Sequence, residues 1–598
     1  MIPVFRTQSK RILKFPIIQS KTNLVFMYKN SHLYVAFSII ITIILFSCRT
    51  DKQSETLPIY KITKTMVDDS AMVVTAHPVA SQAGYDIMKQ GGNAVDAAVS
   101  VQFALAVCYP IAGNIGGGGF MVYRGADGST NTLDYREMAP AAAYDDMYLD
   151  ENGDPIAEKS QNGGLSVGVP GTVAGMYAAF EKYSKLKDWK MLLAPAILAA
   201  EEGFKLTDRQ AMLMNKNKAN FDKYNNEPIV FTSKAWKRGD LLIQPKLAST
   251  LKLIAEKGPS GFYQGIVADQ IVTQMKKSGG IITHEDLKTY SAKWREPITF
   301  NYRGNKIISM PPPSSGGIAL AQIFGMVEAY NLKDLKYHSK DHLHLVAEAE
   351  RRAYADRATH LGDSDFYNVP ISGLIDRGYL KNRMSDFDLA KATVSENTKA
   401  GDAKESLETT HYSIVDVEGN AVSMTTTLNG GYGSKLVVAE AGFLLNNEMD
   451  DFSAKPGTPN MFGLVGAEAN KIEPGKRMLS SMTPTIVEKD GKLLLICGTP
   501  GGSTIITSVF QTVSNVIDFD MTATEAVQSP RFHHQWLPDA LILEDVGFDT
   551  LLVNELNEMG HHAKLRGKLG KVEAIKILEN GNIEGAADTR ADDDVKGF

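Results

Sequence analysis

The stretch Leu407-Glu408-Thr409-Thr410-His411-Tyr412-Ser413 is the part of the sequence from which the fold and the chemistry of this chain are best inferred. It leads into a β-rich run from Thr410 to Asp416, which the tripeptide Glu418-Gly419-Asn420 separates from a second β-rich run, 421–428. β-branched residues in both arms and Gly-Asn at the bend predict a β-hairpin.

A chain cut before Thr409 would begin with a threonine that carries a hydroxyl and a free α-amine on one residue. An α-amine titrates near pH 7.7–8, roughly where it can accept the hydroxyl proton at neutral pH. The stretch would then supply a nucleophile and its own base. Taken alone, Thr-Thr-His is also typical of an ordinary surface strand, so the surrounding sequence has to decide.

Two glycine-rich segments have the composition of site loops. The segment 113–119 is not followed by the Lys-Ser/Thr of a phosphate-binding loop, so close backbone packing beside a site is the better interpretation. Pro500-Gly501-Gly502-Ser503 lies between a strand-like run, 493–497, and a helical pattern through Val516 that Ser503 is predicted to cap. A strand, a Gly-Gly turn and a helix start can present backbone N–H groups to an oxyanion. A plain tight turn is the alternative.

The rest of the chain alternates helical and strand-like patterns. Apolar spacing predicts helices within 78–107, with a break at 91–93, and in 173–200 and 341–358. Residues 120–124 and 130–135 are predicted to form a strand pair. The polar segment 388–406 precedes Glu408, and we expect it to be flexible and solvated, so that a newly cut end could move away from the nucleophile.

Composition excludes several classes of protein. A net charge of −6 over 598 residues leaves no basic surface typical of nucleic-acid binding. Three cysteines, Cys48, Cys108 and Cys497, are too few for a disulfide framework. His533-His534 has no acidic or cysteine partner at ligand spacing, so no metal site is predicted.

The first 48 residues have the features of an export signal. The apolar run 33–46 is too short for a confident membrane-spanning helix and ends at Ser47-Cys48, as in a bacterial lipoprotein signal whose cysteine is lipidated. We therefore expect a signal segment at 1–48, with lipidation at Cys48, and a tether at 49–60. Met27 is a second plausible start. This predicts a periplasmic or cell-envelope protein that meets the membrane only through its N-terminal segment. An uncleaved membrane anchor and an unmodified, buried Cys48 are the alternatives.

Eight blocks, in a shared order, resemble a known family. They are 409–413 (TTHYS), 427–429 (TLN), 445–452 (LNNEMDDF), 479–482 (LSSM), 499–503 (TPGGS), 114–120 (NIGGGGF), 135–140 (YREMAP) and 311–317 (PPPSSGG). From about residue 60 to 598 the chain resembles γ-glutamyltransferase (γ-glutamyltranspeptidase), a family of N-terminal-nucleophile hydrolases.

The resemblance implies an α+β fold, the four-layer αββα sandwich of that superfamily. It implies a proenzyme that cleaves itself between Glu408 and Thr409, with 61–408 as the large subunit and 409–598 as the small one. The two subunits are expected to stay together as a heterodimer, because Arg136 lies upstream and Asp451 downstream of the cut. No metal or organic cofactor is implied.

The resemblance also assigns roles to residues. It implies that Thr409 is the nucleophile, that Thr427 hydrogen-bonds it, and that Gly501 and Gly502 form the oxyanion hole. For a γ-glutamyl substrate it implies an ammonium site at Asn429, Glu448 and Asp451, and a carboxylate site at Arg136, Ser480 and Ser481. One departure is Phe462, in a lid-like insertion at 455–466, where a tyrosine is common in bacterial relatives.

The activity implied is transfer of the γ-glutamyl group of glutathione and related compounds, through a γ-glutamyl ester, to water or to an amino acid or peptide. A cephalosporin acylase of the same fold acts on a glutaryl group without an α-ammonium, so Asp451 and Arg136 argue against it. A non-catalytic solute-binding lipoprotein would suit Cys48 but gives no reason for Thr409, Thr427 and Gly501-Gly502 together.

Overall fold

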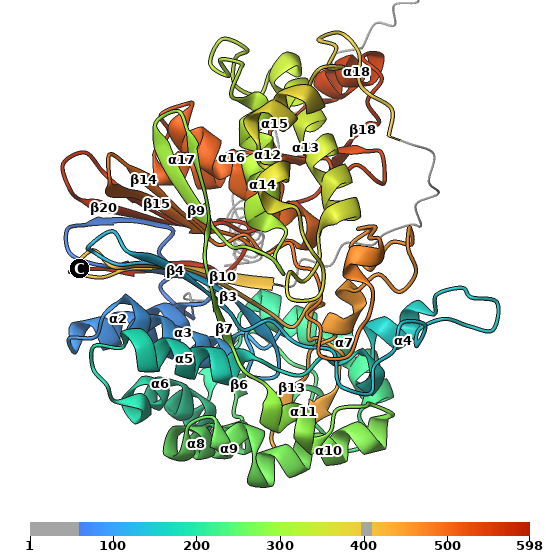
Figure 1. Cartoon of the computed structure of the whole chain (residues 1–598). Helices are drawn as coiled ribbons and strands as arrows, with labels where there is room; N and C mark the ends of the chain where they lie inside the picture. Colours follow the sequence, from blue (N-terminus) through green and yellow to red (C-terminus); the bar gives the residue numbers. More distant parts are fainter. Residues whose placement is uncertain (1–58, 396–408) are drawn as a thin grey trace, which may run out of the picture. The chain divides into compact units, whose positions relative to one another are not determined.

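Two seven-stranded β-sheets stacked face to face form the centre of the molecule (Figure 1). The structure is a computed structural model that describes residues 59–395 and 409–598, and residues 59–598 form one compact unit. The predicted signal segment with Met27 and Cys48, nearly all of the tether, and Glu408 lie outside the described residues.

Each sheet takes strands from both sides of residue 408. One sheet has the order β1 (Thr65–Asp68), β20 (Ile583–Ala587), β19 (Glu573–Ile577), β15 (Lys492–Gly498), β14 (Thr485–Lys489), β9 (Asn305–Ser309), β8 (Ile298–Tyr302). The other has the order β21 (Asp594–Gly597), β2 (Met72–Thr75), β10 (Thr409–Val415), β11 (Ala421–Thr427), β3 (Gly118–Arg124), β4 (Thr130–Asp134), β7 (Lys293–Arg295). Neither half of the chain therefore completes a sheet alone.

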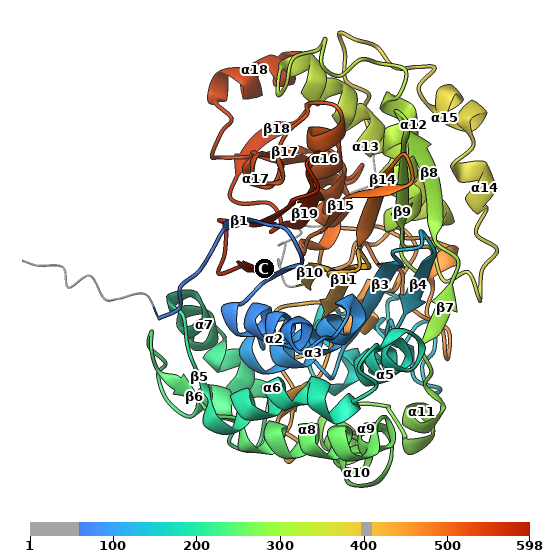
Figure 2. The same ribbon diagram turned by 90° about the vertical axis from the view of Figure 1, so that its left-hand side faces the viewer.

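Helices cover the outer face of each sheet (Figures 1 and 2). In Figure 2, the β10-containing sheet is covered by α2 (Pro78–Lys89), α3 (Ala94–Cys108), α5 (Thr172–Tyr183) and, further out, α6 (Trp189–Glu202), α8 (Pro245–Lys257) and α10 (Gly265–Ser278). The β15-containing sheet is covered by α12 (Gly316–Val327), α16 (Ile505–Ile517) and α17 (Ala523–Gln528), with α13 (Lys340–His360) packed against α12. Around these lie α4 (Ala157–Gln161), α7 (Asp208–Tyr224), α9 (Ser260–Tyr263), α11 (His284–Thr289), α14 (Ile371–Leu374), α15 (Arg377–Arg383) and α18 (Thr550–Glu558).

Apolar cores fill the spaces between the four layers. Val74, Ile486 and Ile575 belong to the core between the sheets, while separate buried clusters lie between each sheet and its helices. Because strand side chains alternate between the two faces of a sheet, one strand can serve two cores. The predicted four-layer αββα sandwich is confirmed.

The predicted hairpin is present as β10 and β11, which pair antiparallel from Thr409 opposite Thr427 to Val415 opposite Ala421. The bend contains Gly419 at φ 88°, a conformation that glycine adopts without strain. The hairpin lies in mid-sheet, because β10 also pairs with β2 and β11 with β3. The end of β10 is thereby held by strands on both sides.

The predicted helix break at 91–93 is also present. Asn93 caps α3 through a reciprocal hydrogen-bond pair with Asp96, which satisfies N–H groups at the helix start. The predicted cap at Ser503 is wrong. A short 3-10 turn, η5 (Gly502–Thr504), comes first, so that α16 begins at Ile505 and Thr504 stands at its N-cap. Among the described helices, none combines the length and apolar character needed to cross a bilayer.

Candidate active site

Thr409 stands at the first position of β10, 5% exposed, with its hydroxyl 3.4 Å from that of Thr427. The Thr427 oxygen accepts the Asn429 backbone N–H at 2.7 Å. Since a hydroxyl has one proton to donate, this acceptor role leaves the Thr427 proton available for the Thr409 oxygen. The two threonines face each other because the β10–β11 register places them in one cross-strand pair.

The glycine-rich segment before β3 supports β11 behind this pair. A Cβ on Gly117 would lie 2.1 Å from the Thr427 carbonyl oxygen, so only glycine allows the approach. Asn114 donates to the same carbonyl at 2.8 Å and accepts the Gly117 N–H at 3.0 Å. The prediction that this segment packs backbone against backbone beside the site is confirmed.

A pocket of about 280 Å³, including space open to solvent, lies in front of Thr409. Nine of the predicted site residues line it, namely Arg136, Thr409, Thr427, Asn429, Glu448, Asp451, Ser480, Ser481 and Gly502. Phe462, Leu464, Met482 and Ile505 complete the lining. Gly501 is not among the lining residues but precedes Gly502 in the same turn. The residues singled out in the sequence thus come together around one space.

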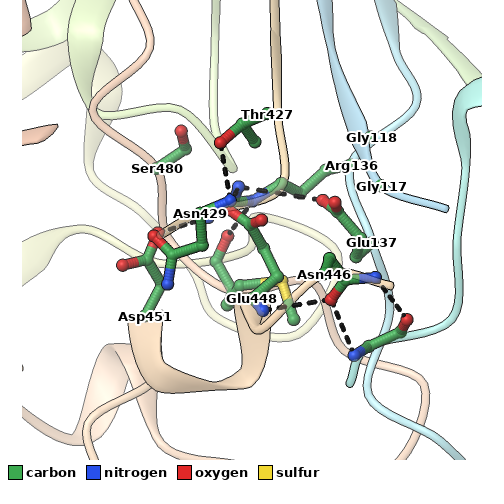
Figure 3. A network of polar contacts seen from close by, with 12 residues as sticks. Gly117, Gly118, Arg136, Glu137, Thr427, Asn429, Asn446, Glu448, Asp451 and Ser480 are labelled. Atoms are coloured by element: carbon green, nitrogen blue, oxygen red, sulfur yellow. Dashed lines mark hydrogen bonds and ion pairs between the residues drawn. The ribbon is translucent and has the colours of Figure 1, made fainter. Parts of the chain in front are cut away.

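Arg136 is the centre of the pocket's charge network (Figure 3). It forms an ion pair with Glu448, a second with Asp451 at 2.5 Å, and a longer contact with Glu137 at 3.8 Å. Its guanidinium also donates to the Met478 carbonyl at 3.2 Å. One arginine therefore faces three carboxyl groups, and this part of the pocket favours an additional positive charge.

Glu137 is a member of this cluster that we did not single out from the sequence. It is fully buried, and neither carboxyl oxygen has a hydrogen-bond partner among the described residues. Burial raises the pKa of Glu137 to about 7, against the opposing effect of Arg136. Burial likewise raises the pKa of Glu448 and of Asp451. The cluster therefore releases its protons at higher pH than separate carboxyl groups would.

We expect Glu137 to make the fold less stable as the pH rises. In the unfolded chain it ionises near pH 4.3, roughly, whereas in the fold it keeps its proton to about pH 7. Between these values the fold binds more protons than the unfolded chain, so stability falls with rising pH. Glu137→Gln should abolish this pH-dependent loss, which amounts to up to about 3 kcal/mol in the free energy of unfolding. The unfolding temperature of the variant should therefore fall less between pH 5 and pH 8. An unchanged pH dependence would contradict the burial of this carboxyl.

Each serine of the pair accepts a hydrogen bond, one from a neighbouring backbone N–H and one from a distant arginine. The Ser480 oxygen accepts the Met482 N–H at 3.1 Å, and the Ser481 oxygen accepts from Arg357 at 3.2 Å. With an acceptor position of each oxygen taken, both hydroxyl protons remain available as donors. The pair is therefore suited to an anionic group in the pocket.

Gly501 and Gly502 form the turn between β15 and α16, with φ 148° and 55°. Within the described residues, neither N–H donates to a protein acceptor. Gly502 lines the pocket beside Thr409. Two backbone donors without a protein partner next to the predicted nucleophile are what an oxyanion would require.

The loop 455–466 lies over the pocket. Phe462 is buried, and its ring lies where a Cβ on Gly502 would come within 2.5 Å. Asn460, which we did not predict, donates to Asp451 at 2.9 Å. Asp450 accepts the Met461 N–H at 3.0 Å and so anchors the loop, whereas Asp451 faces the pocket. The neighbouring aspartates thus have different contacts.

His344, Glu348 and His561 are the group in the described structure whose ligand atoms could surround a cation, all within 4.8 Å of one another. Glu348, however, accepts from Arg351 and from Arg352, at 3.3 and 2.6 Å. Two guanidinium groups on the one carboxylate oppose binding of a metal cation there. His411, within β10, is buried and hydrogen-bonded to Thr425 and Ser413, and burial lowers its pKa to about 3, so it is a neutral structural group.

Comparison with known proteins is consistent with this geometry. A family model described as Gamma-glutamyltranspeptidase matches residues 80–598. The glutathione hydrolase proenzyme of Escherichia coli (strain K12) is 47% identical over 529 residues, which cover 88% of this chain and 91% of the relative.

Solved structures are also similar. A gamma-glutamyltranspeptidase chain from Helicobacter pylori is 45% identical with a TM-score of 0.53, and the match covers 56% of this chain and 95% of that one. A cephalosporin acylase from Bacillus halodurans has a TM-score of 0.79 at 25% identity, covering 92% of this chain and 99% of that one. The backbone is thus shared with acylases, while the sequence is much nearer to glutathione hydrolases. The chain belongs to the gamma-glutamyltranspeptidase family.

Proposed function

We propose that this enzyme cleaves itself before Thr409 and then transfers γ-glutamyl groups from glutathione and related compounds to water or to an amino acid or peptide. The observation that carries the proposal is the pocket in which the Thr409 hydroxyl faces the Arg136, Glu448 and Asp451 network. A γ-glutamyl group has an α-ammonium, an α-carboxylate and a reactive carbonyl, and this pocket has a complement for each.

Maturation is the first reaction at this site. The Thr409 oxygen attacks the Glu408 carbonyl carbon, the peptide C–N bond breaks, and an ester replaces the amide. Water then hydrolyses the ester, releasing Glu408 as a carboxylic acid and leaving Thr409 with a free α-amine and its hydroxyl. Glu408, which we expect on the other side of the cut, lies outside the described structure.

Turnover repeats the same chemistry on substrate. The α-amine of Thr409 accepts the hydroxyl proton as the oxygen attacks the γ-carbonyl carbon, and Thr427 donates to the attacking oxygen. The N–H groups of Gly501 and Gly502 stabilise the oxyanion. The leaving amine takes the proton as its bond to the carbonyl carbon breaks. Water or an acceptor amine then attacks the γ-glutamyl ester and restores the threonine.

The charge network explains selection of the glutamyl end. An α-ammonium beside Asp451, Glu448 and Asn429 supplies the positive charge that the carboxyl cluster favours, and an α-carboxylate accepts from Ser480, Ser481 and Arg136. A glutaryl group would leave the acidic side without a partner, which disfavours acylase activity despite the shared fold.

Two measurements on protein lacking the first 48 residues test this function. Intact mass with mapping of new ends should find a fragment that begins Thr409-Thr410-His411. The same preparation should release p-nitroaniline from L-γ-glutamyl-p-nitroanilide, and glutamate and cysteinylglycine in equal amounts from glutathione. A cut chain without γ-glutamyl activity would refute the proposed substrate class. An uncut, inactive chain would refute the proposed mechanism.

Gly502→Ala should lower kcat about a hundredfold. The added Cβ would meet the Phe462 ring, and alanine is strained at φ 55°, so the N–H would leave its place beside the oxyanion. The matched control is Gly491→Ala, which has a similar φ of 75° but open space around its Cβ. Steady-state kinetics should find kcat preserved in the control. A loss below threefold in Gly502→Ala would contradict its role.

We further propose that the large and small subunits stay together as a heterodimer and that the protein is anchored in the cell envelope. The shared sheets support the first point. The sequence around Cys48 supports the second, and fractionation of cells producing wild-type or Cys48→Ala protein tests it. Recovery of both forms in the same fraction would count against lipidation as the anchor.

A further inference from the structure

Arg357 differs from the other buried arginines in the part of the chain that the structure describes. It lies near the end of α13 and is 5% exposed. Buried arginines elsewhere in the described residues pair with a carboxylate, namely Arg124, Arg136, Arg351, Arg352, Arg477 and Arg531. Arg357 has no such ion pair there, although a buried charge without a partner is costly. The position therefore needs an explanation.

The hydrogen bonds of Arg357 lead to the substrate pocket. Its Nη2 donates to the Ser481 hydroxyl oxygen at 3.2 Å, and its Nε donates to the Ser315 hydroxyl oxygen at 3.0 Å. Ser315 in turn donates through its hydroxyl to the Ser480 carbonyl at 2.7 Å and through its N–H to the same carbonyl at 2.8 Å. One guanidinium thus holds both members of the serine pair.

This arrangement orients the serine protons. Because Ser481 accepts from Arg357, its own proton points to another acceptor, and the Met482 N–H has the same effect on Ser480. The guanidinium also strengthens the hydroxyl that it contacts as a donor, since hydrogen bonds in a chain polarise one another. Both serines are prepared to donate and not to accept.

The charges of the pocket point the same way. Arg136 is already paired with Glu448 and Asp451, so its charge is largely balanced before a substrate arrives. Burial raises the pKa of Asp451, and the charges of Arg136 and Arg357 oppose that rise, which puts Arg357 within electrostatic reach of the same pocket. The positive charge without a carboxylate partner among the described residues is therefore on the serine side.

We infer that Arg357 is a positioning residue for the substrate α-carboxylate: it fixes the Ser481 hydroxyl as a donor, it holds the Ser480 backbone in place through Ser315, and its charge attracts the carboxylate that the serines bind. The inference rests on the proposed function and adds a specificity element to it. Arg357 does not touch the reacting carbonyl, so it acts on recognition of the glutamyl end and not on the chemical step.

Three donors that differ only at the glutamyl end provide the test. They are L-γ-glutamyl-p-nitroanilide, glutaryl-p-nitroanilide, which lacks the α-ammonium, and 4-aminobutanoyl-p-nitroanilide, which lacks the α-carboxylate. Arg357→Gln should lower kcat/KM about tenfold or more for the two donors with a carboxylate, mainly through KM, and less than twofold for the third. For a compound that is turned over too slowly, its inhibition constant is measured in place of kcat/KM.

Two controls separate positioning from structure. Arg352 is a buried arginine of the same helix, and it pairs with Glu348. Arg352→Gln should affect the three donors alike. In a Ser481→Ala background, Arg357→Gln should cost clearly less than in the wild-type background, because the hydroxyl that it orients is gone and only its charge and its contact with Ser315 remain. Additive losses would contradict action through Ser481.

Maturation of each variant is measured first by intact mass. If Arg357→Gln stays uncut, Arg357→Lys is used for the test, because lysine keeps the charge but cannot bond both serines. It should lower kcat/KM for the same two donors, by a smaller factor. Equal losses on the three donors, no loss on any, or failure of both variants to mature would overturn the inference. Absence of wild-type activity on the γ-glutamyl donor would instead refute the proposed function.

Discussion

Thr409→Ala should yield a single uncut chain whose γ-glutamyl activity is reduced by about 10⁴-fold or more, because one hydroxyl is the nucleophile of both reactions. The fold should survive, since Thr409 stands at the start of β10 and its hydroxyl contacts Thr427 alone among the described residues. Intact mass reports the missing cut, and release of p-nitroaniline reports the missing turnover.

Thr410→Ala is the matched control for this loss. Thr410 is the next residue of the same strand and is fully buried, and its hydroxyl has no hydrogen-bond partner among the described residues. Removing a buried polar group without a partner is neutral or stabilising. The control should therefore be cut and active. A processed, active Thr409→Ala protein would refute the mechanism outright.

Asp451→Asn should lower kcat/KM for γ-glutamyl donors about a hundredfold and leave maturation intact. The substitution keeps the shape of the side chain but removes the charge that would pair with the substrate α-ammonium, and loss of one partner of a buried charge pair weakens binding by about 3 kcal/mol. The preference for L-γ-glutamyl-p-nitroanilide over its glutaryl analogue should shrink with it, because the ammonium loses its main counter-charge.

Asp450→Asn distinguishes this effect from damage to the loop. Asp450 accepts from Ser160 at 2.6 Å and from the Met461 N–H at 3.0 Å, so its loss should loosen the loop over the pocket. Both donors should then be affected in the same proportion. If Asp451→Asn fails to mature, or loses both donors equally, Asp451 is structural.

Local structure was predictable where chemistry within a few residues decides it. The hairpin follows from β-branched arms around Gly419, and the break between α2 and α3 follows from the Gly-Gly-Asn sequence at 91–93. The cap at Ser503 was mispredicted, because the positive φ of Gly502 starts a 3-10 turn before the helix, and its sequence looks like that of a simple helix start. The positions of the pocket residues came from resemblance, and their roles remain predictions.

Contacts between distant segments could not be read from the sequence. The sequence signal for Glu137 was its position next to Arg136. Its burial could not be predicted, because it depends on β3 and the sheet around it. Arg357 reaches Ser481 across 124 residues, through the packing of α13 against α12. In both cases a charged residue in an ordinary helical or loop pattern gains its role from tertiary packing alone.

The shared sheets have a consequence for the mature protein. A cut before Thr409 would leave two polypeptides that both contribute strands to each sheet, so that β10 and β11 stay hydrogen-bonded to β2 and β3 of the other fragment. Separating the fragments would expose both sheets and all the cores between the layers. Mature molecules should therefore not exchange subunits with one another: isotopically heavy and light enzyme, mixed and incubated, should give no hybrid species in native mass spectra short of unfolding.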